Sequence, residues 1–145
     1  QGLPPIIYGD GKQTRCFSFI QDVLSCLMTA CLDDEPLGNV INVGPDEEII
    51  TINQLSEKIC ELTNFRGVPE FLPARPQEVK HAVCSSNKAR KILDYGTKVN
   101  LEDGLKSMVQ YIEKRGVSKF NRHIPVEIIS DLTPKTWISD RMNQK

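Results

Sequence analysis

Residues 6–23 constrain the fold more than any other part of the chain, because several local signals follow one another without a gap. Residues 6–8 are an apolar run, and Gly9 and Gly11 then permit a tight turn, since glycine tolerates positive φ. Residues 15–19 are again strand-like, and a helical apolar period begins at Ile20. We therefore expect two short strands, a glycine turn and a helix. The position of this segment close to the N-terminus predicts that the chain is the back half of something larger.

The remainder of the chain alternates between strand-like and helical patterns. Residues 39–43 and 68–72 have the composition of strands, and Thr51 with Gln54 fits a helix capping box. Asn100 can cap a last helix, which Gly116 would end. The first helix has an apolar stripe, formed by Ile20, Val23, Leu24, Leu27, Met28 and Cys31. The alternation predicts an α/β or α+β fold with a small mixed sheet and several helices.

Charge and cysteine content exclude several classes of function. The net charge is −1 and the basic residues are scattered, so we expect neither nucleic acid nor a membrane surface as a partner. Nothing approaches 18 consecutive apolar residues, the length of a membrane span. The chain has 5 cysteines, an odd number, and none forms a C-x-x-C pair, which favours a reducing compartment and predicts a cytoplasmic protein. His81 and His123 have no partners at metal-ligand spacing, so we predict no metal site.

Motifs that carry catalysis or bind a dinucleotide are missing from the sequence. There is no G-x-G-x-x-G after a strand, no phosphate-binding G-x-x-x-x-G-K-[ST] and no G-x-S-x-G. Tyr8 and Lys12 have Y-x-x-x-K spacing, but Gly9 and Gly11 lie between them and oppose a shared helical face. We therefore assign no catalytic residue and no cofactor-binding residue to this chain.

Two arginines are the strongest candidates for ligand binding. Arg15 lies beside the glycine turn, and Arg75 lies in a loop framed by Pro73 and Pro76. A guanidinium is always charged, and its planar fork suits phosphate oxygens, so two converging arginines could clamp a diphosphate. The alternative is that each is an ordinary surface arginine, which isolated arginines usually are.

Four segments, in order, resemble the C-terminal half of the extended short-chain dehydrogenases, the NAD-dependent nucleotide-sugar epimerases, dehydratases and decarboxylases. Residues 8–23 resemble the signature at the start of that half, and residues 42–44 followed by 51–52 resemble its strand–loop–helix element. Residues 73–79 resemble its P-x-R-x-G-D segment, and residues 85–93 with 101–105 resemble its closing helices. The resemblance covers residue 5 to about residue 113.

The resemblance implies a role for individual residues. Arg15 and Arg75 match the two arginines that hold the substrate diphosphate, and Phe17 matches an aromatic position near the nucleoside. Glu78 stands where the family often has an aspartate that reaches the ribose. Gln77 replaces the usual glycine, which puts the loop shape in question.

Three further positions carry expectations about structure. Ser85 replaces a common aspartate and would then serve only as a helix cap, and Asp22 is expected to be structural. Trp137 is expected to be a packing anchor against an absent domain.

The implied fold is the substrate-binding part of an extended short-chain dehydrogenase that lacks most of its Rossmann domain. Residues 1–116 would form the substrate-binding domain, and residues 117–145 a tail that packs on the missing cofactor domain. The implied parent resembles UDP-glucose 4-epimerase, binds a UDP-sugar, uses NAD and can be a homodimer. It would be an isomerase or lyase of carbohydrate metabolism. Because the family's cofactor site and catalytic residues lie in the missing N-terminal half, we expect this chain to hold no cofactor and to be catalytically silent alone.

Two other functions remain open at this point. The chain could be a stand-alone binding or interaction module that has kept the fold and lost catalysis, or a generic α/β domain with a chance match. A missing cofactor domain predicts an exposed apolar docking surface, whereas a stand-alone module predicts a well-solvated surface.

Overall fold

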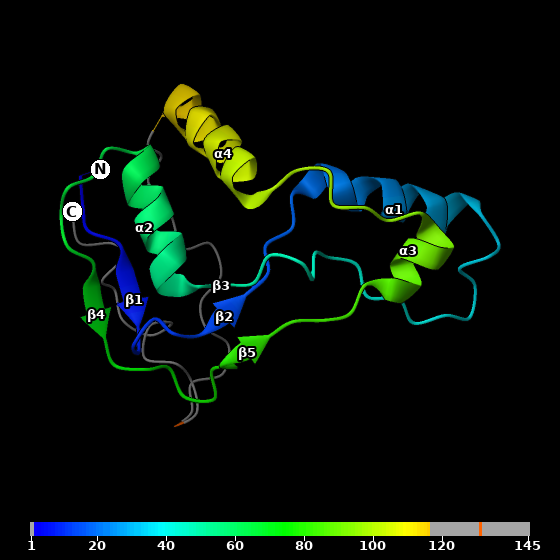
Figure 1. Ribbon diagram of the computed structural model, residues 1–145, viewed down its shortest axis with the longest axis horizontal. Coiled ribbons are helices and arrows are strands. Elements are labelled where there is room, and N and C mark those ends of the chain that lie inside the picture. Colours follow the sequence, from blue (N-terminus) through cyan, green and yellow to red (C-terminus); the bar gives the residue numbers. More distant parts are fainter. Residues whose placement is uncertain (1, 117–130, 132–145) are drawn as a thin grey trace.

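The computed structural model describes residues 2–116 and residue 131 as two small sheets flanked by helices (Figure 1). In the first sheet, β1 (Ile6–Tyr8) pairs in parallel with β4 (Glu70–Leu72). In the second, β2 (Thr14–Arg15) is central, antiparallel to β3 (Ile50–Thr51) and parallel to β5 (His81–Ala82). The expected mixed α/β architecture is confirmed, and β5 is a strand that the sequence pattern did not reveal.

The described part of the chain contains helices, two of which begin at predicted caps. The helices are α1 (Ile20–Leu32), α2 (Ile52–Leu62), α3 (Asn87–Leu93) and α4 (Leu101–Arg115). Thr51 and Gln54 form the predicted capping box on α2, and the Asn100 side chain accepts the Asp103 N–H at the start of α4. None of the described helices is both long and apolar enough to cross a membrane.

A small core joins α1 to α3. Cys26, Ala89, Leu93 and Tyr95 are its buried members, and half-buried Ile41, Val43 and Ile92 pack against it. Burial raises the pKa of the Tyr95 hydroxyl. In Figure 1, α1 and α3 lie together at one end of the molecule, whereas α2 lies beside the strands and α4 lies beside α2.

The prediction of a strand at residues 39–43 is wrong for this structure. Ile41 and Val43 turn toward the core, while Val40 is 87% exposed, so side chains still alternate as in a strand. However, no described strand lies beside this segment, and a strand needs a neighbour to complete its hydrogen bonds. The predicted strand at residues 15–19 is likewise limited to Thr14–Arg15.

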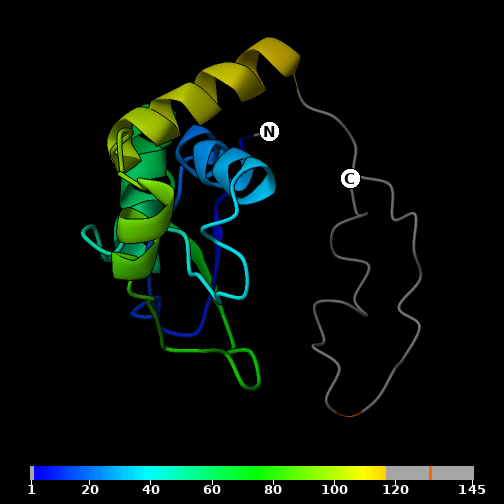
Figure 2. The same ribbon diagram turned by 90° about the vertical axis from the view of Figure 1, so that its right-hand side faces the viewer.

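The predicted apolar stripe on α1 exists, but much of it faces outward. Its members Ile20, Leu24, Leu27 and Met28 are each between 48% and 61% exposed, and Leu32, outside the predicted stripe, is 75% exposed. Figure 2 shows α1 toward the viewer, with no other described helix in front of it. The helix therefore buries Cys26 and Asp22 on one side and exposes apolar side chains on the other.

Candidate functional site

Arg15 lies on the central strand of the second sheet and is held by two contacts. Its Nη2 atom lies 3.6 Å from the Oε1 atom of Glu78, and both side chains are 25% exposed. Its Nη1 atom donates a hydrogen bond of 2.7 Å to the carbonyl oxygen of Thr14. The structure thus brings two of the predicted site residues together, although they are far apart in the sequence.

A turn after β4 carries Arg75 and Glu78 at its two ends. The Glu78 N–H donates to the Arg75 carbonyl oxygen at 3.4 Å, and Gln77 has φ of 59°. Positive φ at the third residue, after a proline at the second, is typical of a type II turn. Gln77 therefore adopts the backbone conformation that glycine would favour, which answers the question about the loop shape.

The Arg75 guanidinium lies over an aromatic ring. Its Cζ atom is 4.0 Å from the centroid of the Tyr8 ring, within the range of a cation–π interaction. This contact could not be predicted from local sequence, because Tyr8 ends β1, Arg75 lies in the loop after β4, and the pairing of β1 with β4 places them together.

The glycine turn between β1 and β2 is anchored by side chains from both sides. Gln13 Nε2 donates to the Tyr8 carbonyl oxygen at 2.9 Å, and Asn53 Nδ2 donates to the Asp10 carbonyl oxygen at 3.0 Å. Gly11, with φ of 68°, packs so closely that a Cβ atom would lie 1.8 Å from Asn53 Oδ1. Tyr8 and Lys12 therefore flank a turn and do not share a helical face.

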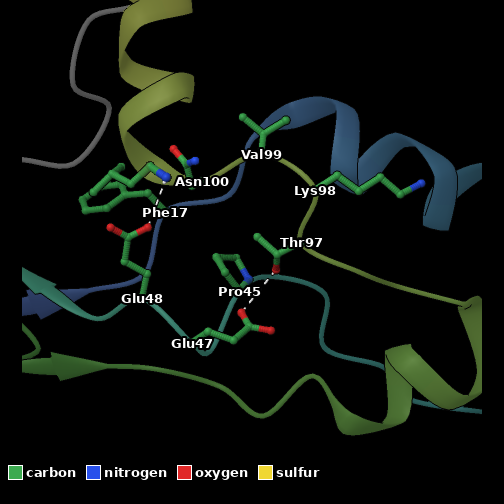
Figure 3. A pocket seen from close by; sticks show the side chains of 9 residues that line it. Phe17, Pro45, Glu47, Glu48, Thr97, Lys98, Val99 and Asn100 are labelled. Carbon is green, nitrogen blue, oxygen red and sulfur yellow. Dashed lines mark hydrogen bonds between the residues drawn. The ribbon is translucent and has the colours of Figure 1, made fainter.

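Phe17, two residues after Arg15, lines a hollow of about 340 Å³ whose lining includes neither arginine. The hollow lies where three loop segments meet the start of α4, and its lining residues are Phe17, Pro45, Glu47, Glu48, Thr97, Lys98, Val99, Asn100 and Leu101. Figure 3 shows Phe17 beside Glu48 at one end, with the Lys98 side chain pointing away. Phe17 is 37% exposed, so part of its surface is accessible to a ligand.

Asp22 is structural, as expected. Its side chain is 4% exposed and its Oδ2 atom accepts the N–H groups of Lys98, at 3.1 Å, and Val99, at 3.2 Å. The carboxylate thus ties the start of α1 to the loop that leads into α4. Ser85 Oγ accepts the Asn87 N–H at 3.4 Å, a long hydrogen bond near the start of α3.

A network of charged side chains holds the loop of residues 45–48, which lines the hollow. Arg90 pairs with Asp46 and Glu47, and the Ser86 N–H donates to Asp46 at 2.9 Å. Hydrogen bonds from Arg90 and then Ser86 lower the pKa of Asp46 to about 2. Burial opposes ionisation of Glu47, but hydrogen bonds, first from Arg90, lower the pKa of that group overall.

Nothing in the described residues points to a metal or disulfide. No group of three or more His, Cys, Asp or Glu side chains within that part could hold a metal ion. All 5 cysteines are free thiols. Burial, followed by the charge of Cys84, raises the pKa of Cys16, so this thiol next to Arg15 stays protonated near neutral pH.

Comparison with known families gives one match that covers most of the chain. The family model described as GDP-mannose 4,6 dehydratase matches residues 1–108. Among curated proteins, UDP-glucuronate 4-epimerase of Thermodesulfobacterium geofontis is 32% identical over 109 residues, which are 74% of this chain and 33% of that protein. UDP-N-acetyl-alpha-D-glucosaminuronate decarboxylase of Bacillus cytotoxicus is 29% identical over 120 residues, 79% of this chain and 37% of that protein.

Solved structures of related enzymes share the fold. UDP-glucose 4-epimerase of Thermotoga maritima, solved with UDP-glucose, has a TM-score of 0.73 and 31% identity, covering 79% of this chain and 36% of that one. UDP-glucuronic acid 4-epimerase of Bacillus cereus, in complex with UDP-glucuronic acid and NAD, has a TM-score of 0.73 and 30% identity, covering 79% and 37%. The chain thus spans about a third of the length of these relatives.

Proposed function

Because the chain belongs to the GDP-mannose 4,6 dehydratase family, we propose that it is the nucleotide-sugar-binding half of an NAD-dependent epimerase, dehydratase or decarboxylase. The observation that carries the proposal is the arrangement of Arg15, Arg75 and Glu78. One arginine lies on a strand and the other at the start of a turn, and Glu78 at the end of that turn pairs with the first. The ion pair therefore brings the turn that carries Arg75 to the strand that carries Arg15, and two such guanidinium groups suit a diphosphate.

The nucleoside would be uridine, held by Phe17 and Glu78. The names of the related epimerases and decarboxylases specify UDP-sugars, whereas the family model is named for a GDP-sugar. Phe17 offers an exposed aromatic face for a base, and the Glu78 carboxylate can accept hydrogen bonds from ribose hydroxyls.

The exposed apolar face of α1 favours this function over a stand-alone module. A surface that includes Leu24, Leu27 and Met28 is typical of an interface and not of a well-solvated monomer. The alternating segment 39–43, which pairs with no described strand, follows α1 in the chain and could offer its backbone to a neighbouring strand. A Rossmann domain, which is a parallel sheet with helices on both faces, would cover the apolar face of α1 and pair with residues 39–43.

Catalysis would then require that second domain. Hydride transfer needs a bound nicotinamide and a positioned base, and we assign neither to the residues of this chain. We expect the isolated chain, supplied with NAD and UDP-glucose or UDP-glucuronate, to leave both sugars unchanged. Turnover by the isolated chain would contradict this part of the proposal.

A titration with UDP, followed by backbone amide signals in NMR spectra, tests the binding function even when affinity is low. We expect shifts at residues 8–18 and 73–79, and weaker binding of GDP than of UDP. Arg15→Ala and Arg75→Ala should each weaken UDP binding roughly tenfold or more, the effect of losing a charge-assisted hydrogen bond. Arg66→Ala, which removes an exposed arginine from another loop, is the matched control. Equal affinity in all four proteins, or no shift at millimolar UDP, would contradict the proposal.

A further inference from the structure

Tyr8 and Arg75 form a contact that the proposed binding function does not by itself require. The Arg75 Cζ atom lies 4.0 Å from the centroid of the Tyr8 ring, and Tyr8 is half-buried while Arg75 is exposed. An exposed arginine normally samples many rotamers, and holding one of them costs side-chain entropy. A ring beneath the guanidinium reduces that freedom before any ligand arrives.

The backbone fixes the relative position of the two side chains. Tyr8 pairs with Leu72 at the ends of β1 and β4, and the Gly9 N–H donates to the Leu72 carbonyl oxygen at 2.9 Å. A Cβ atom on Gly9 would lie 3.4 Å from Ala74 Cβ, so the loop after β4 passes close to the backbone that follows Tyr8. Arg75 is the next residue of that loop.

The contact leaves the guanidinium able to bind an anion. A cation–π interaction uses the positive charge over the ring face and does not consume the N–H donors. Arg15 differs, because one of its nitrogens donates to Thr14 and another faces Glu78. Arg75 is therefore the arginine whose donors are oriented without an acidic partner among its described contacts.

We propose that Tyr8 is a positioning residue that pre-orients Arg75 for a diphosphate. The inference rests on the proposed function, because it assigns Tyr8 a role toward an arginine of that same site. The π-face of the ring carries the effect, so the hydroxyl group is dispensable. Pre-orientation increases affinity by lowering the entropy lost on binding, without adding a contact to the ligand.

The test weakens the negative potential on the face of the ring at position 8 while keeping the shape of the ring. Tyr8→Phe, and then phenylalanine with increasing fluorination at position 8, should keep the fold because the ring size changes little. With Tyr8→Phe as the reference, UDP affinity should fall stepwise along the fluorinated series, by roughly threefold to tenfold in all, as fluorine weakens the cation–π attraction. The ring-current shift of the Arg75 side-chain protons, measured without nucleotide, should diminish along the same series.

The Arg75→Ala background separates positioning from general structure. There, fluorination at position 8 should leave UDP affinity unchanged, since the cation that the ring orients is gone. Equal affinity across the series with Arg75 present, or an equal decline with Arg75 absent, would overturn the inference. If Arg75→Ala itself binds UDP as tightly as the unsubstituted chain, the proposed function fails. If UDP affinity does not change along the fluorination series while Arg75→Ala still weakens binding, the proposed function stands and the role of Tyr8 is refuted.

Discussion

The guanidinium of Arg15 lies 3.6 Å from the carboxylate of Glu78, so an arginine proposed to bind diphosphate is paired with an acid in the free protein. The two groups are partly exposed, and such pairs are worth little to stability. The ion pair instead affects ligand binding, because an anion that approaches Arg15 must compete with the Glu78 carboxylate. The same carboxylate is the group proposed to accept hydrogen bonds from the ribose.

Glu78→Gln should therefore change the affinities for pyrophosphate and UDP by different amounts. Pyrophosphate, which has no ribose, should bind roughly threefold more tightly because a competing negative charge is lost. UDP should gain less or bind more weakly, because a charged acceptor for the ribose hydroxyls becomes a neutral one. Calorimetric or NMR titrations of both ligands give the ratio, with Glu61→Gln on α2 as the control. Parallel changes for UDP and pyrophosphate would contradict the ribose role.

Phe17→Leu should weaken UDP binding roughly tenfold and leave pyrophosphate binding unchanged. The expected loss is that of stacking between an aromatic side chain and a base. Leucine keeps an apolar group beside Pro45 and Glu48, so the lining of the hollow should survive. A loss of pyrophosphate affinity in the same variant would show that Phe17 acts on the arginines and not on the nucleoside.

Gln77→Gly should stabilise the chain by about 0.5–1 kcal/mol. Gln77 has φ of 59°, which costs a residue with a Cβ atom about 1–2 kcal/mol, and part of that gain is offset by the greater freedom of glycine in the unfolded chain. Urea unfolding measures the difference, and Gln77→Ala, which keeps the Cβ atom, should show no gain. A destabilised glycine variant would mean that the glutamine side chain contributes contacts that outweigh the backbone strain.

Asp46→Asn should destabilise the chain at neutral pH and matter progressively less in acid. The native pKa of Asp46 is lowered to about 2 from an ordinary value of 3.8, mainly by Arg90. The stabilisation from the ionised carboxylate is therefore present above about pH 4 and is lost as the pH falls through about 2. Unfolding curves of both proteins between pH 7 and pH 2 should converge at the acid end. Asp34→Asn, at an exposed position, should not show this convergence; parallel curves for Asp46→Asn would contradict the assignment.

Local chemistry made much of the fold predictable from the sequence. The capping box at Thr51 and the cap at Asn100 depend only on neighbouring residues, and both were predicted correctly. The glycine turn before Arg15 was predictable for the same reason. Residues 39–43 kept the alternation of a strand but not its hydrogen bonds, because a strand depends on a partner that local sequence does not specify.

The candidate site was predictable only in part. Residue type identified Arg15 and Arg75 as candidates, and the family resemblance added Phe17 and Glu78. Spacing could not show that Arg15 meets Glu78 while Arg75 meets Tyr8. Those contacts follow from the pairing of β1 with β4 and of β2 with β5, which are long-range and leave little trace in local composition. The predicted roles of residues 117–145 and of Trp137 fall outside the described residues, and those predictions stand as made.

The side-chain Nε–H signals of the arginines test the central claim most directly, because they report on the groups proposed to hold the diphosphate. In the isotopically labelled chain titrated with UDP, the Arg15 and Arg75 signals should shift together and saturate with one dissociation constant, while Arg66 stays unchanged. Uridine, which lacks phosphate, should leave all three in place. Shifts of Arg66 alone, or equal responses to uridine and UDP, would contradict the account.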